Sequence, residues 1–228
     1  VEPEIAFADI HDNADLAEDL LKHVFKAVLD ERQDDMAFID ERIQKGSSAR
    51  LEDIVGSSFV RMDYDEAIKL RPGFAAAFYS RGFAFQKEDE LDQAIQDFDQ
   101  AIRLEPGDAS ALALRGSAYQ RKGELDRAIE DFTRSIELNP HDAATFHNRG
   151  VAHSGKRQWD FAIRDFDQAI RLQPDDASTF ANRGAAYQRK GELDRALQDL
   201  DRAIELDPRL TVAFAYRGAA YSMRGEWD

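Results

Sequence analysis

Three histidines have a spacing that first suggests a metal site. His141, His147 and His153 follow one another at intervals of six residues, and a neutral imidazole is a common metal ligand. Six residues turn an α-helix by about 240°, so His147 and His153 do not share a helix face. His141 follows Pro140 directly, ahead of any helix. The spacing therefore predicts no metal site, and instead an exposed His147 beside a packed His153.

Groups that could carry catalysis are abundant, but none is arranged as an active site. The chain has 45 aspartates and glutamates and no cysteine, which excludes a cysteine nucleophile, a thiolate metal site and a disulfide scaffold. The carboxylates recur at a regular spacing, so no pair stands out as a general acid and base. No nucleophile elbow, phosphate-binding loop or dinucleotide-binding fingerprint occurs. We therefore predict a protein that is not an enzyme and holds no cofactor.

A row of arginines has the spacing of an ion-pair ladder. Each arginine precedes one of a series of regularly spaced glycines, and an aspartate follows sixteen residues later. The pairs consist of Arg81, Arg115, Arg149 and Arg183 with Asp97, Asp131, Asp165 and Asp199. Guanidinium and carboxylate groups form paired hydrogen bonds, so a ladder within the fold is the favoured interpretation. The alternative is a row of anion-binding sites.

The elements that position these residues repeat every 34 residues. Prolines stand at 72, 106, 140, 174 and 208, and glycines at 82, 116, 150, 184 and 218. The period predicts four whole units, 75–108, 109–142, 143–176 and 177–210. Residues 211–228 begin a fifth unit, and 57–74 match only the second half of one. This partial unit either has a degenerate first helix or lacks residues near Ser58.

The apolar spacing within a unit predicts two helices, of which the second ends at the proline. In the second unit we expect the first helix over about 110–122, with Asp126 as N-cap of the second helix. Gly116 would lie inside the first helix, where glycine costs about 1 kcal/mol relative to alanine, so close helix packing is its expected role. One helix pair cannot bury its own apolar face. The chain is therefore predicted to be an all-α solenoid, a superhelix of antiparallel helix pairs.

Over residues 75–228 this pattern resembles the tetratricopeptide repeat. In the third unit the residues that carry the resemblance are Phe146, Gly150, Ala162, Phe166, Ala169 and Pro174. Arginine replaces the usual leucine before each glycine, and His153 stands at a usually aromatic position. The resemblance implies a concave groove, lined by the first helices, in which an extended peptide or a partner helix docks.

The resemblance also assigns side chains to this groove. They are Tyr79, Ser80, Phe83, Lys87, Leu114, Arg121, His147, Asn148, Asn182, Arg189 and Tyr216. Asn148 and Asn182 can both donate and accept hydrogen bonds, which suits an extended peptide backbone. Tyr79, Leu114 and Tyr216, with Phe83, are anchor candidates at positions that the core is not expected to need.

Several cations would make one edge of the groove basic. They are Lys87, Arg121 and Arg189, with Lys122, Lys156 and Lys190 beside them. The alternative is that they only solvate helix ends and pair with nearby acids. Chaperone-binding members of the family clamp a terminal carboxylate with a lysine at the fifth position of a unit. That position holds Tyr79, Ala113, His147, Ala181 and Ala215 here, so the clamp is not carried over.

The net charge of −15 is distributed unevenly along the chain. Residues 1–56 carry −9 and residues 57–228 carry −6. The acid excess argues against a sequence-independent nucleic-acid binder. Residues 1–56 lack the repeat, and an acidic helical N-terminal cap is their favoured role. The alternatives are an internal competitor for the basic groove edge and the tail of another domain.

Together these patterns predict a non-enzymatic scaffold for protein–protein interaction whose partner is a protein or peptide. The alternative is a regulatory or targeting region of a larger enzyme with its catalytic domain outside this chain. Phe214, Tyr221 and Trp227 would be partly uncovered, so either the natural protein continues or another chain covers this face, and an end-to-end homodimer is expected. No apolar run approaches the roughly 18 residues of a membrane span. A soluble, cytoplasmic protein is favoured, although the absence of cysteine does not fix the compartment.

Overall fold

The structure is a computed structural model of the 228-residue chain, and it describes residues 26 and 64–225. The chain divides into two units, residues 1–62 and 63–228, and residues 64–225 belong to the second. The cap expected over residues 1–56 lies outside the described residues, as do Trp227 and the start of the helix expected from Phe59.

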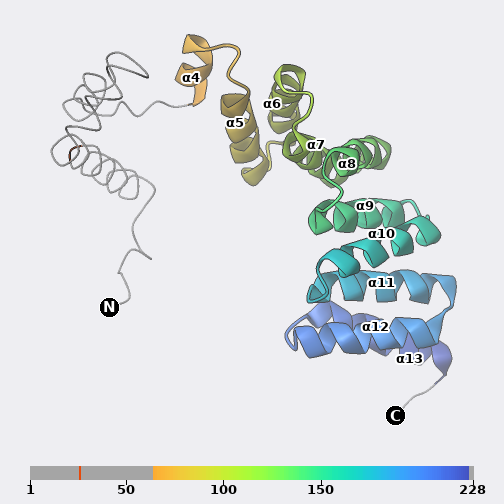
Figure 1. The fold of residues 1–228 in the computed structure, drawn as a ribbon. Helices are drawn as coiled ribbons and strands as arrows, with labels where there is room; N and C mark the ends of the chain where they lie inside the picture. The colour runs from red at the N-terminus through yellow and green to blue at the C-terminus, as the bar shows by residue number, and fades with distance from the viewer. Residues whose placement is uncertain (1–25, 27–63, 226–228) are drawn as a thin grey trace, which may run out of the picture. The chain divides into compact units, whose positions relative to one another are not determined.

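Residues 64–225 form ten α-helices and no strand, which confirms the predicted all-α solenoid (Figure 1). The helices are α4 (Tyr64–Leu70), α5 (Ala75–Lys87), α6 (Leu91–Leu104), α7 (Ala109–Arg121), α8 (Leu125–Leu138), α9 (Ala143–Gly155), α10 (Trp159–Leu172), α11 (Ala177–Lys190), α12 (Leu193–Leu206) and α13 (Thr211–Arg224).

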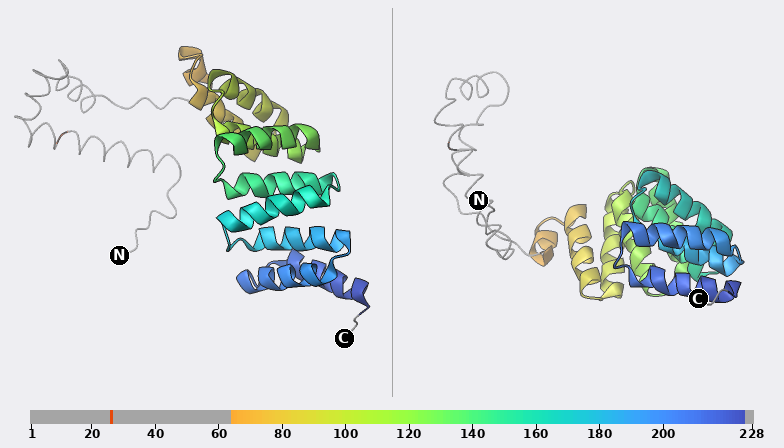
Figure 2. Two further views of the ribbon diagram at one scale, coloured as in Figure 1. Left: turned by 45° about the vertical axis from the view of Figure 1, so that its right-hand side comes forward. Right: turned by 90° about the horizontal axis from the view of Figure 1, so that it is seen from below.

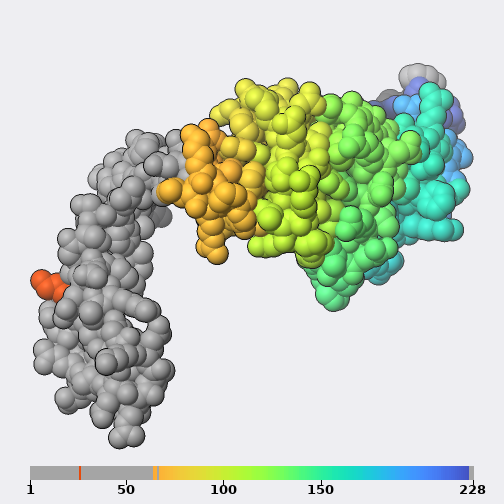
Figure 3. Space-filling model, turned by 90° about the horizontal axis from the view of Figure 1, so that it is seen from above, coloured from red at the N-terminus to blue at the C-terminus, as the bar shows by residue number. Residues whose placement is uncertain are grey.

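The helices pack as antiparallel pairs that stack in chain order (Figure 2). Each of the predicted units 75–108, 109–142, 143–176 and 177–210 contains one pair, and α13 alone follows them. Consecutive first helices also contact one another, from α5 through α7, α9 and α11 to α13. Figure 3 shows the side chains of successive units, from yellow through green to teal, in contact along the stack.

Three first helices, α7, α9 and α11, begin with a side-chain cap, whereas the first helices α5 and α13 and the second helices α6, α8, α10 and α12 do not. The Asp108 carboxylate accepts hydrogen bonds from the backbone N–H groups of Ser110 and Ala111, at the start of α7. Asp142 and Asp176 cap α9 and α11 in the same manner. The second helices have no side-chain cap.

The expected N-cap role of Asp126 is wrong, because α8 has Glu124 as its N-cap and Asp126 lies in its first turn. The chain leaves α7 through Gly123, which has a φ of 79°, and the Glu124 N–H donates back to the Tyr119 carbonyl. This closing turn directs the chain into α8 two residues earlier than expected.

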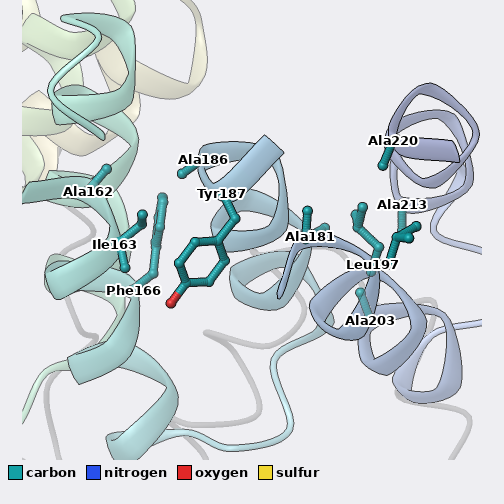
Figure 4. Close-up of a cluster of buried hydrophobic side chains, with 12 residues drawn as sticks. Ala162, Ile163, Phe166, Ala181, Ala186, Tyr187, Leu197, Ala203, Ala213 and Ala220 are labelled. Carbon is teal, nitrogen blue, oxygen red and sulfur yellow. The ribbon is translucent and has the colours of Figure 1, made fainter. Parts of the chain in front are cut away.

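The core lies between the helices of each pair and between neighbouring pairs. Phe132 and Phe166 are fully buried and lie against glycines of the first helices. A Cβ added to Gly116 would lie 2.9 Å from Phe132 Cε1, and one added to Gly150 would lie 2.7 Å from Phe166 Cε1. The glycines therefore permit the close approach that the sequence predicts. Figure 4 shows Phe166 of α10 beside Tyr187 of α11 in the cluster of the C-terminal units.

Candidate functional site

Each arginine of the predicted ladder joins two second helices. Arg115 Nε and Nη2 donate to the two carboxylate oxygens of Asp131, at 2.8 and 2.6 Å. Its Nη1 donates to Asp99 of the preceding unit, at 2.6 Å. The Asp131 side chain is only 5% exposed. The hydrogen bond that Arg115 donates to Asp131 holds the pKa of the guanidinium above its usual range, against the opposing effect of burial.

The structure brings together all four predicted arginine–aspartate pairs, Arg81–Asp97, Arg115–Asp131, Arg149–Asp165 and Arg183–Asp199. Each guanidinium also makes a third contact, to a residue sixteen positions earlier, that was not predicted from the sequence. The acceptors are Asp65, Asp99, Thr133 and Asp167, and Asp201 plays this part for Arg217. The regular spacing of sixteen residues between each acceptor and its arginine could have revealed these acceptors in the sequence. Because these donors point at groups of the same chain, the geometry favours an ion-pair ladder over anion sites.

The first helices α9, α11 and α13 contribute to a cavity of about 790 Å³. Trp159 of α10 supplies apolar surface, with Val151 and Met223 from the first helices, and the fully buried Phe166 lies behind them. Polar groups come from Ser154, Asn182, Gln188 and Arg189. The Ser154 Oγ is buried and has no hydrogen-bond partner among the described residues. An apolar cavity with a few converging polar groups is typical of a ligand site.

Three of the predicted groove residues, Asn182, Arg189 and Tyr216, line this cavity. The others lie outside it. Phe83, Lys87 and Arg121 are exposed, whereas Tyr79, Ser80, Leu114, His147 and Asn148 are half-buried. The predicted groove contained only residues of the first helices, so it lacked Trp159 and Phe166, which belong to a second helix.

The expectation that the core does not need the anchor candidates is wrong for Tyr79, Leu114 and Tyr216. Tyr79 packs edge-on against Phe98, with 6.2 Å between the ring centroids. Leu114 packs against the same buried cluster, and Tyr216 packs against the cluster of the C-terminal units. The reason is that each first helix also contacts the first helix of the next unit. Phe83 is 41% exposed, and its ring centroid lies 5.0 Å from Lys87 Nζ.

His147 is half-buried rather than exposed, because α11 packs beside it. Its Nδ1 lies 2.6 Å from the Thr179 hydroxyl, and its Nε2 lies 3.4 Å from the Asn182 side-chain nitrogen. The Thr179 hydroxyl donates to Asp176, so Nδ1 must donate to Thr179 and Nε2 is left to accept from Asn182. Burial lowers the pKa of His147, partly offset by Asp176. A neutral His147 thus orients the amide of Asn182.

His153 is packed, as expected from the sequence. His153 stacks on Phe161 with 5.3 Å between ring centroids, and its Nδ1 lies 2.8 Å from Gln158 Oε1. Among the described residues, no group of three or more histidines and carboxylates is placed to hold a metal ion. None of the helices from α4 to α13 combines the length and apolar character needed to cross a membrane.

Most of the cations on the predicted basic edge are paired with acids. Lys122 Nζ lies 2.6 Å from Asp92, Lys190 Nζ lies 2.7 Å from Asp160, and Lys156 pairs with Asp126. Each acid stands in the first turn of the preceding second helix. Arg121 donates to the Gln86 carbonyl and to Asp89. These contacts favour the interpretation that the cations pair with nearby acids. It applies to Lys122, Lys156, Lys190 and Arg121.

Arg189 differs from these paired cations. It lines the cavity, it is exposed, and it forms no ion pair with any of the residues that the structure describes. Lys87 likewise has no ion pair among the described residues, but it lies outside the cavity, against the Phe83 ring.

Comparison with known proteins identifies the family. Models described as tetratricopeptide repeat match residues 75–108, 109–142 and 149–220. The chain belongs to the tetratricopeptide repeat family. The matched residues of this repeat protein include the whole arginine ladder and most of the cavity, and the resemblance inferred from the third unit is confirmed.

Solved structures of other repeat proteins share the fold. The chain is 22% identical to YrrB, "a TPR protein with an unusual peptide-binding site", with a TM-score of 0.64 over 73% of this chain and 86% of that one. MamA from Desulfovibrio magneticus RS-1 is 19% identical, with a TM-score of 0.64 over 67% and 86%. The first repeat domain of Spaghetti (RPAP3), bound to the HSP90 peptide SRMEEVD, is 25% identical, with a TM-score of 0.50 over 51% and 93%.

A second kind of similarity covers a short stretch of this repeat protein. Asparagine–tRNA ligases from Hahella chejuensis and Psychromonas ingrahamii are each 64% identical to it over 70 residues. The stretch is 31% of this chain and 15% of each ligase, so the chain spans a small part of these curated relatives.

Proposed function

We propose that this repeat protein is a non-enzymatic scaffold that binds an extended peptide or partner helix in the cavity between α9, α11 and α13. The observation that carries the proposal is the cavity itself, with its apolar walls and its converging polar groups. In the described part of the chain, Arg189 is exposed and has no ion pair, so its guanidinium can serve a ligand. The family fold supports a role in protein interaction.

The cavity chemistry indicates what the ligand presents. Asn182 donates one amide hydrogen to His147 and keeps its carbonyl oxygen and second hydrogen for a peptide backbone. Trp159, with Val151 and Met223, offers an apolar surface for one large side chain. Arg189 can pair with a carboxylate beside that side chain. The expected ligand is therefore a peptide with an apolar residue next to an acidic one.

A displayed random-peptide library, selected on the full chain, provides the probe. The selected peptides are then titrated by fluorescence anisotropy against the full chain and against Asn182→Ala and Arg189→Ala. Each variant is expected to weaken binding about tenfold, the cost of one hydrogen bond to a charged or backbone group. The control is Arg171→Ala on α10, where Arg171 is exposed and donates only to Gln168. An equal loss in the control, or no enriched peptide, would contradict the proposal.

A second candidate function rests on the ligase similarity. We propose that the 70 similar residues lie within residues 1–74, which precede the first matched repeat, and that the repeats then form a regulatory or targeting region of a larger enzyme. The test is the complete reading frame at the genomic locus. A frame that joins this sequence to a ligase catalytic domain is expected, and a frame without a catalytic domain contradicts this candidate.

A further inference from the structure

The turn between α9 and α10 has the opposite charge to the same turn in the first unit. Residues 156–158 are Lys-Arg-Gln, whereas residues 88–90, between α5 and α6, are Glu-Asp-Glu. Two cations in the third unit thus replace three carboxylates in the first. Arg157, at the centre of the turn, is exposed, and its side chain forms no hydrogen bond or ion pair with any residue of the described range 64–225.

The backbone of Arg157 has a left-handed conformation that glycine adopts more easily. Its φ is 59°, and the equivalent positions of three other units hold Gly123, Gly191 and Gly225, with φ values of 79°, 82° and 77°. This conformation is unfavourable for a residue that carries a Cβ. The turn itself therefore does not need an arginine, and a role of the side chain outside the fold would explain its presence.

In the first two units this turn forms an ion pair with the next first helix. Asp89 accepts a hydrogen bond from Arg121 Nη2 at 2.6 Å. Arg157 and Arg189 stand at the positions of Asp89 and Arg121, two repeats later in the chain. The helices α9 and α11 contact each other as α5 and α7 do. The repeat thus places two guanidinium groups where the first two units have a guanidinium and a carboxylate. We call Arg157 and Arg189 the rim site.

The described residues supply no carboxylate to the rim site. Glu124 and Glu192, next to the turn glycines of the second and fourth units, have the uncharged Gln158 as their equivalent. Asp160, at the start of α10, pairs instead with Lys190. Two like charges at neighbouring positions repel each other, and an anion between them turns this repulsion into attraction. The rim site therefore has the charge arrangement of an anion site.

The rim site adjoins the cavity between α9, α11 and α13. Arg189 lines the cavity, as do Ser154 and Gly155, which precede Arg157 by three and two residues. A ligand that extends from the cavity past Gly155 therefore comes within reach of both arginines.

We propose that the rim site binds a phosphoryl group on the peptide that occupies the cavity, so that the preferred ligand carries a phosphorylated serine or threonine at its acidic position. A phosphoryl group has nearly two negative charges at pH 7 and three acceptor oxygens, which suits two guanidinium groups. A carboxylate has one charge and matches a single arginine. The identity of the ligand as a peptide rests on the proposed function, whereas the rim site can be tested without a peptide.

The first test uses the tightest-binding peptide from the library selection on the full chain. It is synthesised with glutamate, phosphoserine or serine at its acidic position and titrated by fluorescence anisotropy. The phosphoserine form should bind about tenfold more tightly than the glutamate form, because it gains a charge-assisted hydrogen bond from the second arginine. Arg157→Gly should remove most of this preference. The control Arg171→Gln should keep it, since Arg171 is exposed and donates only to Gln168.

Arg157→Gly also separates loss of binding from loss of folding. Glycine relieves the left-handed conformation at this position, so the melting temperature should hold or rise.

The second test uses inorganic phosphate alone. The Nε–H signals of Arg157 and Arg189 in the NMR spectrum of the full chain are followed as phosphate replaces chloride at constant ionic strength. Both signals should shift saturably, and the Arg171 signal should not. In Arg157→Gly the shift of Arg189 should need a higher phosphate concentration, because one of the two cations is gone.

The two tests distinguish failure of the rim site from failure of the proposed function. Saturable phosphate shifts together with no selected peptide would support the rim site and contradict peptide binding in the cavity. Three results would overturn the rim site while leaving peptide binding in place: equal binding of the phosphoserine and glutamate forms, a phosphoserine preference that survives in Arg157→Gly, or phosphate shifts at Arg171 as large as those at the two arginines.

Discussion

Gly150 and Gly218 occupy the same position in two units, but their surroundings differ. A methyl group at Gly150 would lie 2.7 Å from Phe166 Cε1, whereas one at Gly218 meets open space. Gly150→Ala should therefore destabilise the protein by about 1–3 kcal/mol through overpacking. Gly218→Ala should stabilise it by up to about 1 kcal/mol, since alanine has the higher helix propensity. Urea unfolding followed by circular dichroism measures both, and equal effects of the two changes would contradict the packing role of Gly150.

The ladder arginines should contribute to stability rather than to ligand binding. Arg115→Met leaves the nearly buried Asp131 without its partner and should cost about 3 kcal/mol in urea unfolding. The matched control is Arg202→Met, because Arg202 is exposed and pairs with Glu205 of its own helix, so its loss should have little effect. Unchanged stability of Arg115→Met together with lost peptide binding would restore the anion-site alternative.

His147 should make stability depend on pH. Burial lowers the pKa of its imidazole in the folded protein, while the unfolded chain has the ordinary value of about 6.5. Between these two pKa values the unfolded chain binds more protons than the folded protein does. The contribution of His147 to the free energy of unfolding is therefore present above the ordinary pKa and is lost as the pH falls below it. Asp176 is the charged group that faces the imidazole.

The measurement compares urea unfolding at pH 7.5 and pH 5.5. His147→Gln should lose less stability between the two pH values than the unaltered chain, and His141→Gln, at an exposed position, should behave like the unaltered chain. The same pH dependence in all three proteins would show that His147 is not the responsible group.

At the scale of the helix, the two kinds of N-terminus should respond differently to mutation. Asp142 accepts hydrogen bonds from the Ala144 N–H and the Thr145 hydroxyl, so Asp142→Ala should destabilise the protein by about 1 kcal/mol. Glu124 is the N-cap of α8 but its side chain caps no N–H, so Glu124→Ala should have the smaller effect. Thermal unfolding measures both variants, and an equal loss would contradict the assignment of the caps.

At the scale of the whole molecule, the stacked pairs should fold without the acidic N-terminal residues. Residues 63–228 form their own unit and contain three buried hydrophobic clusters, so this fragment should keep its helical circular dichroism spectrum and unfold cooperatively. A fragment without helical signal would contradict this. A full chain that is more stable than the fragment would favour the cap role for residues 1–56, and tighter peptide binding by the fragment would favour the competitor role.

The period of 34 was sufficient to predict the helix pairs, the glycine packing and the arginine–aspartate pairs, because these contacts lie within one unit. The caps at Asp108, Asp142 and Asp176 also depend only on neighbouring residues, because each aspartate directly precedes the helix that it caps. The start of the second helices was predicted too late, because the closing turn at Gly123 depends on backbone geometry rather than on the best capping side chain.

What the sequence by itself determined was therefore the repeat, the all-α solenoid and the contacts inside each unit. Only the tertiary structure decided the contacts between units: the second carboxylate at Arg115, the burial of His147 beside Thr179, and the pairing of Lys122 with Asp92. The cavity belongs to the same class. The physical reason is the angle and offset at which one helix pair packs on the next, which many side chains set together. Of these contacts, only the second carboxylate at Arg115 and the pairing of Lys122 recur at a regular spacing that could have indicated them.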